Sequence, residues 1–275
     1  MDLPPLLDNK PTDSPSVFTP SALLREARRQ KGIARAEAPP VCILDPDGDL
    51  VRRLRLSGEA KPFRNWPCYH TELDVFRLGS REVGIVGRVV GASFAVLVAE
   101  ELFESGCRLI VSLTSAGEIT PAGPPPYFVV IDRALRDEGT SYHYTPPSVF
   151  SDGAPALVAA AAKGLSTLRQ RSVVGPSWTT DAPFRETAEA IGAARGKGIL
   201  AVEMEASALY AFARAKNVRV LCLAHVTNTM GQVAIDFEKG EADGTEDALT
   251  VLEKVVTALE ETELSRGVRK PQSTP

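Results

Sequence analysis

The sequence has few of the residues that bind metals or form disulfides. Among its 275 residues are four cysteines with no Cys-x-x-Cys pair, Cys42, Cys68, Cys107 and Cys222, and three scattered histidines. Zinc sites and disulfide frameworks need such residues at close, regular spacings. The sequence therefore predicts no metal site and no cofactor, and its isolated cysteines favour a reducing, cytoplasmic location.

A broad excess of positive charge is also missing. The formal net charge is -4, so the chain lacks the basic field with which proteins bind nucleic acid. No apolar run approaches the length that spans a bilayer, and the N-terminus lacks the basic stretch and apolar core of a secretory signal. We therefore expect neither a nucleic acid nor a membrane as a partner.

What the sequence does contain is a regular series of short apolar runs. They predict strands at residues 41–44, 73–78, 83–86, 109–113, 128–131 and 218–223. Several are apolar at nearly every position, which is typical of strands that are covered on both faces. Amphipathic stretches predict helices at 92–105, 203–216 and 244–262. The alternation predicts an α/β fold with a central mixed sheet flanked by helices.

No linker divides the middle of the chain, so a single domain is expected over residues 20–265. The segments 1–19 and 266–275 are rich in proline and polar residues. Such segments bury too little apolar surface to offset the entropy of ordering them, and they predict flexible tails.

Three of the expected strands end in polar residues, where ligands bind in open α/β sheets. One runs into Ser115 and Gly117, a second delivers Glu203 and Glu205 to the start of a helix, and a third ends at Asn228. Each pattern also has an ordinary structural explanation. A Ser-Ala-Gly segment is more often a turn, a glutamate caps a helix, and an asparagine closes a turn.

Taken together, these strand ends resemble the nucleoside phosphorylase superfamily, in the branch that includes uridine phosphorylase, bacterial purine nucleoside phosphorylase and methylthioadenosine nucleosidase. The resemblance covers about residues 40–262, and its most specific part is the Glu203-Met204-Glu205 run, which is similar to the family's ribose motif. It implies that Glu205 accepts hydrogen bonds from the 2′ and 3′ hydroxyls, that Met204 packs on the sugar and that Glu203 orders the site. Ser115 is expected on the same ribose side.

Three further segments are similar to the family. Gly91-Ala92-Ser93 resembles its Gly-Pro-Ser helix start, and residues 136–144 resemble a segment of uridine phosphorylases. Residues 179–185 are similar to the loop over the base, which implies that Phe184 covers the base and that Arg185 donates to its carbonyl edge. The remaining base-binding residues implied by the resemblance are Thr114, Ala116, Gly117 and Asn228.

The chain departs from the family where phosphate would bind. Ser112 and Leu50 stand where phosphorylases place phosphate-binding arginines, and the loop before Leu50 carries carboxylates instead. Carboxylates beside an anion site weaken phosphate binding. This favours water over phosphate as the nucleophile, although Arg64, Arg88 or an arginine of a neighbouring subunit would restore a phosphate site. The residues expected in this nucleophile or phosphate region are Ser112, Ser115, Asp47, Asp49 and Arg88.

A second departure concerns the leaving base. Purine enzymes of the family use an aspartate near the end of the last strand as the general acid, whereas this chain has Asn228, and an amide is no acid at neutral pH. A pyrimidine or other oxo-base, stabilised as it leaves by Arg185 and Asn228, is the more natural substrate.

The sequence thus predicts an enzyme that cleaves the N-glycosidic bond of a nucleoside, with Glu205, Asn228 and Arg185 as its catalytic residues. Two alternatives remain: a phosphorylase with a rebuilt phosphate site, for which inorganic phosphate is the co-substrate, and a nucleoside-binding protein without catalysis. The resemblance also implies a homo-oligomer, as a dimer, a trimer of dimers or a hexamer.

Overall fold

The computed structural model describes residues 5–8, 10–229 and 244–267. Its elements follow one another along the chain as α1 (Pro20–Lys31), β1 (Val41–Asp45), α2 (Asp49–Leu56), β2 (Lys61–Pro62), β3 (Asp74–Leu78), β4 (Arg81–Gly87), α3 (Ala92–Glu104), β5 (Leu109–Glu118), β6 (Tyr127–Asp137), η1 (Ser141–His143), β7 (Phe150–Asp152), α4 (Pro155–Leu165), β8 (Ser172–Thr180), η2 (Pro183–Arg185), α5 (Ala188–Gly196), β9 (Ala201–Glu203), α6 (Ala206–Lys216), β10 (Arg219–Asn228) and α7 (Thr245–Gly267).

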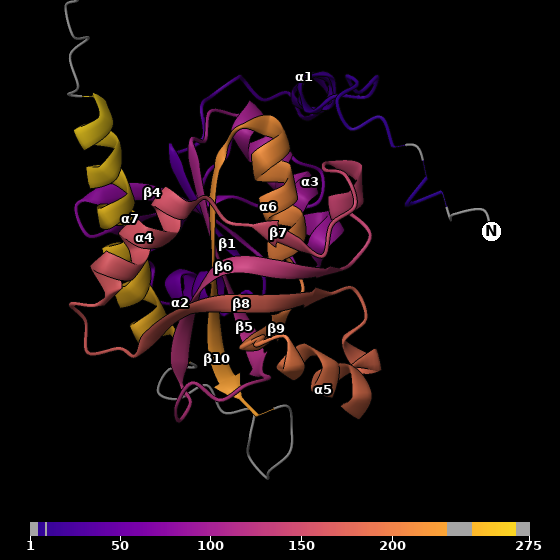
Figure 1. The fold of residues 1–275 in the computed structure, drawn as a ribbon. Helices are drawn as coiled ribbons and strands as arrows, with labels where there is room; N and C mark the ends of the chain where they lie inside the picture. The colour runs from indigo at the N-terminus through magenta and orange to yellow at the C-terminus, as the bar shows by residue number, and fades with distance from the viewer. Residues whose placement is uncertain (1–4, 9, 230–243, 268–275) are drawn as a thin grey trace, which may run out of the picture.

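The strands form one mixed sheet with β5 at its centre (Figure 1). The first half of β5 lies between β1 and β10 and is parallel to both. Its last residues, Gly117 and Glu118, also pair with β9 in the antiparallel direction. Pairing continues from β9 through β8 and β6 to β10, so these strands and β5 close into a ring. The predicted α/β fold with a mixed central sheet is confirmed.

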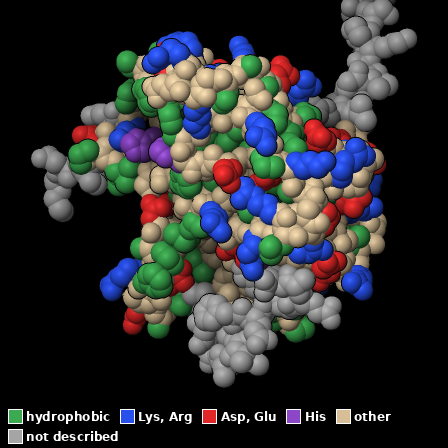
Figure 2. Space-filling model, turned by 180° about the vertical axis from the view of Figure 1, so that it is seen from behind, with side chains coloured by type: hydrophobic (Ala, Val, Ile, Leu, Met, Phe, Trp, Pro, Cys, Tyr) green, Lys and Arg blue, Asp and Glu red, His purple; other side chains and the backbone are tan. Residues whose placement is uncertain are grey.

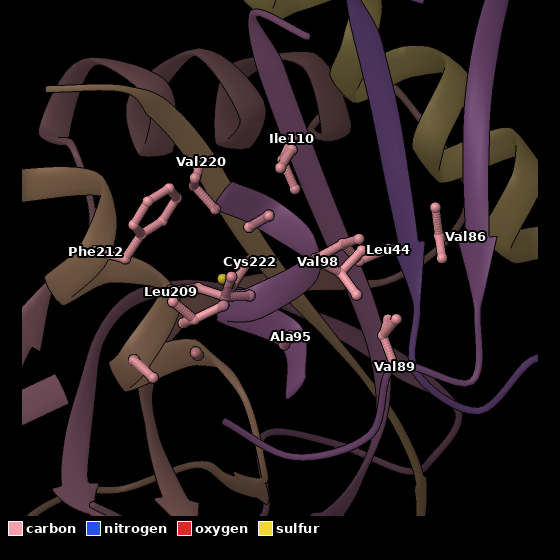
Figure 3. Close-up of a cluster of buried hydrophobic side chains, with 14 of the residues drawn as sticks. Leu44, Val86, Val89, Ala95, Val98, Ile110, Leu209, Phe212, Val220 and Cys222 are labelled. Atoms are coloured by element: carbon pink, nitrogen blue, oxygen red, sulfur yellow. The ribbon is translucent and has the colours of Figure 1, made fainter. Parts of the chain in front are cut away.

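Helices cover both faces of the sheet. Alternate side chains of a strand point to opposite faces, so Leu44 packs toward α3 and α6 while its neighbour Ile43 packs toward α2, α4 and α7. Figure 3 shows the first of these two cores, to which Ile110 and Cys222 of the sheet and Val98 of α3 belong. Both faces are buried, which explains why the sequence of these strands is apolar at nearly every position.

Several strands continue past the apolar runs that predicted them. β5 extends to Glu118, β6 to Asp137 and β10 to Asn228. The polar ends remain extended because neighbouring strands take up their backbone hydrogen bonds; for example, Gly117 pairs with Asn228 of β10 and Val202 of β9. The Ser115-Ala116-Gly117 segment is therefore part of a strand, and the turn considered for it is wrong.

Other elements had no clear sequence signal. Strand β8 contains Gly175 and Pro176, which are unfavourable in strands, yet it is held between β6 and β9. Helices α2, α4 and α5 have only 8, 11 and 9 residues and short apolar stripes.

The surface in Figure 2 carries Lys and Arg side chains mixed with Asp and Glu side chains, not gathered into one field. In the part of the chain described by the structure, no helix is both long and apolar enough to cross a membrane.

Candidate active site

A cleft of about 670 Å³ lies where β5, β9 and β10 end, next to the loop after β1 and the segment between β8 and α5. This volume lies within the range of small-molecule sites. Its lining combines strand ends, the connections between elements and the start of α5: Pro46, Asp47, Val90, Thr114, Ser115, Ala116, Gly117, Pro183, Phe184, Glu186, Ala188, Ile191, Val202, Glu203, Met204, Glu205 and Asn228.

Glu203 ends β9 and holds the start of α6. One carboxylate oxygen accepts hydrogen bonds from the hydroxyls of Ser177 (2.9 Å) and Thr179 (2.5 Å). The other accepts them from the backbone N–H groups of Glu205 and Ala206, both at 2.7 Å. These N–H groups have no partner within the helix, so the carboxylate acts as its cap. Glu203 is buried and its acceptors are occupied by the protein itself.

Glu205 differs from Glu203 because only one of its two carboxylate oxygens accepts a hydrogen bond from the described chain. Its Oε1 accepts a hydrogen bond of 2.7 Å from the backbone N–H of Gly91, at the start of α3. Its Oε2 is buried and has no hydrogen-bond partner in the described chain. Burial, followed by repulsion from Glu203, raises the pKa of Glu205 to about 8. An unsatisfied buried acceptor costs about 1–3 kcal/mol, so a ligand that donates to Oε2 gains that stabilisation.

Asp47 and Ser115 form a second polar contact in the cleft. The backbone N–H of Ser115 donates to one oxygen of Asp47 at 2.8 Å, and its hydroxyl donates to the other at 2.9 Å. The sequence predicts Ser115 beside the ribose and in the nucleophile or phosphate region. In the structure, both of its donors bind the protein's own carboxylate.

The ionisable side chains that line the cleft, among the described residues, all belong to acidic residues. They are Asp47, Glu186, Glu203 and Glu205, and no Lys or Arg of the described residues is among the lining. Glu186 is half-buried, and burial raises its pKa to about 7. The electrostatics of the cleft thus disfavour a free dianion and favour a ligand that donates hydrogen bonds.

Most of the sequence-predicted residues meet in this cleft. Met204 lies between the two glutamates at its wall, and the remaining ones that line it are Thr114, Ser115, Ala116, Gly117, Phe184 and Asn228. Asn228 donates to the hydroxyl of Thr227 at 3.5 Å. The side chain of Phe184 is 99% exposed at the edge of the cleft.

Four predicted residues lie elsewhere. Arg185 is exposed and does not line the cleft in the described part of the chain. Ser112 is buried within β5, and Arg88 lines a separate groove with Arg52 and Arg55. Asp49 pairs with Arg52 at 3.0 Å.

Asp45, the last residue of β1, has a structural role. It accepts hydrogen bonds from the backbone N–H groups of Gly48 (3.2 Å) and Val51 (2.9 Å), around the start of α2. Burial raises the pKa of Asp45 to about 7. Of Asp45, Asp47 and Asp49, only Asp47 therefore lines the cleft.

Sequence reasoning missed Glu186 and the two hydroxyls that hold Glu203. A single glutamate after Pro-Phe-Arg forms no recognisable pattern. Ser177 and Thr179 did give a weak signal, since residues two apart on a strand share a face. No group of three or more His, Cys, Asp and Glu side chains within the described ranges is arranged to hold a metal ion.

Comparison with known proteins agrees with this geometry. The family model of the phosphorylase superfamily matches residues 40–261. A guanosine phosphorylase of Halorubrum lacusprofundi is 27% identical over 184 residues, which cover 62% of this chain and 73% of that protein. The crystal structure of uridine phosphorylase from Vibrio fischeri ES114, complexed with 6-hydroxy-1-naphthoic acid, superposes with a TM-score of 0.70 at 19% identity, covering 84% of this chain and 99% of that one. With more than half of its length matched by the family model, and with the fold shared, the chain belongs to the phosphorylase superfamily.

Proposed function

We propose that the protein cleaves the N-glycosidic bond of a nucleoside and that water is the nucleophile. The choice of water rests on the contact between Asp47 and Ser115. In this contact the carboxylate of Asp47 occupies the two donors of Ser115 that would otherwise bind an anion. Phosphate entering this position meets a negative charge and finds no Lys or Arg among the described lining residues.

The ribose lies against Glu205 and Met204 in this proposal. Oε2 of Glu205 is buried and has no partner among the described residues, so the 2′ and 3′ hydroxyls supply the donors that it lacks. The transition state of glycosidic cleavage carries positive charge on the sugar, and a nearby carboxylate stabilises that charge. Glu203 acts through Glu205, because it fixes the turn of backbone from which Glu205 projects.

The water is positioned by Asp47. A carboxylate that lines the cleft accepts a proton from water as water attacks the sugar carbon, and its two bonds to Ser115 fix its orientation. The bond from the sugar carbon to the base nitrogen breaks, and the electron pair leaves with the base. Asn228 donates a hydrogen bond to the departing base.

A second candidate, phosphate-dependent cleavage, is favoured by the names of two similar proteins. Both the protein of Halorubrum lacusprofundi and that of Vibrio fischeri are phosphorylases, of guanosine and of uridine respectively. Phosphate would use the N–H and hydroxyl of Ser115 if Asp47 turned out of the way. These names also support guanosine and uridine as substrates to test, and both carry oxo-bases.

The two candidates differ in their sugar product. Purified protein is incubated with guanosine, inosine, adenosine and uridine in phosphate-free buffer and in phosphate, and the base and sugar are separated by chromatography. We expect base and free ribose in both buffers at the same rate. Ribose 1-phosphate that forms only with phosphate overturns the choice of water, and release of no base from any nucleoside overturns cleavage itself.

A further inference from the structure

A second groove is formed by a part of the chain that the family model does not match. Helix α1 ends at Lys31, whereas the matched residues begin at residue 40. The helix packs against α3, at the end of the molecule away from α5 (Figure 1). The groove has a volume of about 510 Å³ and is lined by α1, by the segment that follows it and by Glu104, the last residue of α3. None of its lining residues lines the cleft, so the groove is separate from the candidate active site.

The ionisable residues of this groove are mostly basic, in contrast to those of the cleft. Four of the lining side chains are arginines, and only Glu104 is acidic among the described residues of the lining. Arg25, Arg28 and Arg29 are three and four positions apart on α1, so they share one face of the helix. Arg35 lines the same groove from the segment between α1 and β1. Positive charges gathered in this way repel one another and attract anions.

Two of the four arginines already bind a carboxylate. Glu26 accepts hydrogen bonds from Nε of Arg29 at 2.8 Å and from Nε of Arg25 at 3.4 Å. The side chains of Arg28 and Arg35 form no hydrogen bond or ion pair with any described residue, and Nε of Arg28 is buried. A buried donor on a charged group is unfavourable when it has no acceptor, so a ligand that supplies one gains stabilisation.

The usual structural role of arginines at the end of a helix does not account for these two side chains. Basic side chains there often bind the last carbonyl groups of the helix. In α1 the backbone N–H of Gly32 donates to the carbonyls of Arg28 and Arg29, and the N–H of Ile33 donates to that of Arg28. Arg35 lies beyond the helix. The backbone thus caps these carbonyls, and the guanidinium groups of Arg28 and Arg35 can bind another acceptor.

The chemistry of the lining identifies the kind of anion. A guanidinium group presents parallel N–H donors that match two oxygens of one phosphate group, so several guanidinium groups match an anion with several linked phosphate groups. Among the described residues, no aromatic side chain lines the groove, so a nucleotide base has no ring on which to stack. The net charge of the whole chain is -4, which leaves no broad basic field for a nucleic acid strand.

We propose that the groove between α1 and the end of α3 binds a polyphosphate chain, either free or as the phosphate tail of a nucleotide. Arg28 and Arg35 make its main contacts, and Arg25 and Arg29 add positive charge while they remain paired with Glu26. The binding is non-covalent and leaves the cleft open to a nucleoside. The site does not depend on the proposed cleavage reaction.

The test measures binding to the full chain by isothermal titration calorimetry. The ligands are tripolyphosphate, orthophosphate and ATP, each at low and at high salt. The proteins are the wild type, Arg28→Gln, Arg35→Gln and the variant with both substitutions, and thermal unfolding shows whether each is folded. Arg214→Gln is the matched control, because Arg214 is an exposed arginine in the last turn of α6 and lines neither the groove nor the cleft.

We expect the wild type to bind tripolyphosphate about 10-fold or more tightly than orthophosphate, because more guanidinium groups are engaged. ATP should bind within about threefold of tripolyphosphate, because no ring contacts its base. Arg28→Gln and Arg35→Gln should each weaken tripolyphosphate binding about 10-fold, and the double variant about 100-fold. Arg214→Gln should bind like the wild type. High salt should weaken binding to the wild type, because it screens the charges.

No binding of tripolyphosphate to the wild type, or equal binding to the wild type and the double variant, overturns the site. ATP that binds about 10-fold or more tightly than tripolyphosphate overturns recognition through phosphate groups alone. Base release from nucleosides should be the same in the wild type and the double variant, because neither Arg28 nor Arg35 lines the cleft. A failure of the proposed cleavage therefore leaves the polyphosphate site standing, and a failure of the site leaves the cleavage standing.

Discussion

Asp47 and Ser115 are joined by two hydrogen bonds, one from the backbone N–H and one from the hydroxyl of Ser115, with lengths of 2.8 and 2.9 Å. The pair joins the loop after β1 to β5, the strand that pairs with β1 in the sheet. Because each carboxylate oxygen has a separate donor, the contact fixes both the position and the orientation of Asp47.

Replacing Asp47 should let inorganic phosphate bind where the carboxylate of Asp47 was. In Asp47→Ala the donors of Ser115 are released and a negative charge is removed, so inorganic phosphate should bind more tightly than to the wild type. Thermal stabilisation by phosphate measures this. Water-dependent release of base should fall by about 10²–10⁴-fold if Asp47 is the general base. Asp152→Asn, on the exposed surface of β7, serves as the control. Unchanged hydrolysis in Asp47→Ala would remove Asp47 from the mechanism.

Glu205→Gln should weaken both binding and turnover of ribonucleosides. The substitution keeps the shape of the side chain but replaces charge-assisted hydrogen bonds to the hydroxyls by neutral ones and removes the charge beside the developing cation. We expect kcat/KM to fall by about 10²–10³-fold, in line with the loss of a preorganised electrostatic contact. The wild type should also prefer a ribonucleoside to its 2′-deoxy analogue, and Glu205→Gln should lose that preference. Equal discrimination in both proteins would contradict the assignment.

The activity should depend on pH through Glu205. Burial and the charge of Glu203 raise the pKa of Glu205 to about 8, so in the free protein the side chain is largely protonated at neutral pH. If the ionised form stabilises the transition state, kcat/KM should rise with pH and level off above about 8. Initial rates between pH 5.5 and 9.5 would check this. A flat profile over that range would show that ionisation of Glu205 does not limit the reaction.

The free energy of unfolding should also depend on pH through Glu205, but it should fall as the pH rises, whereas the activity rises. The pKa of Glu205 is higher in the folded protein than in the unfolded chain, so the folded state holds its proton more tightly. That contribution is fully present below the unfolded pKa of about 4.5 and is lost as the pH rises through about 8. Glu205→Gln cannot lose a proton. Its free energy of unfolding, relative to the wild type, should therefore increase from pH 5 to pH 8.5 in urea denaturation.

Glu203 should matter for folding more than for chemistry. In Glu203→Ala the hydroxyls of Ser177 and Thr179 and the backbone N–H groups at the start of α6 lose their acceptor. Each buried donor that stays unpaired costs about 1–3 kcal/mol, so the free energy of unfolding should fall by several kcal/mol. Denaturant unfolding measures the loss, with Glu189→Gln as an exposed control. A loss below about 1 kcal/mol would mean that water or a rearranged helix start replaces the cap.

The sequence predicted the central strands and much of the cleft because both depend on local patterns. Ile43 and Leu44 belong to a run that is apolar on both faces, and Glu203-Met204-Glu205 marks a strand-to-helix junction. The sequence could not tell the two glutamates fully apart, because their roles depend on partners distant in the chain: Ser177 for Glu203 and Gly91 for Glu205.

The sequence also failed to predict the positions of other residues, because these positions depend on tertiary structure. Arg185 and Glu186 are adjacent, and only the backbone course after η2 decides that the glutamate lines the cleft while the arginine is exposed. Strand β8 carries glycine and proline within it, and its place is set by pairing with β6 and β9. Hydrophobic period and motif spacing carry no information about such tertiary choices.

The ring of strands that begins and ends at β5 has a consequence for how this protein can change during evolution. Glu203, the last residue of β9, belongs to that ring, whereas residues 181–187 form a short connection outside the strands. Substitutions in this connection therefore change the wall of the cleft and leave the strand pairing of the ring intact. The lining of the cleft and the stability of the sheet can diverge separately, and grafting this connection between homologues would exchange one part of the cleft wall.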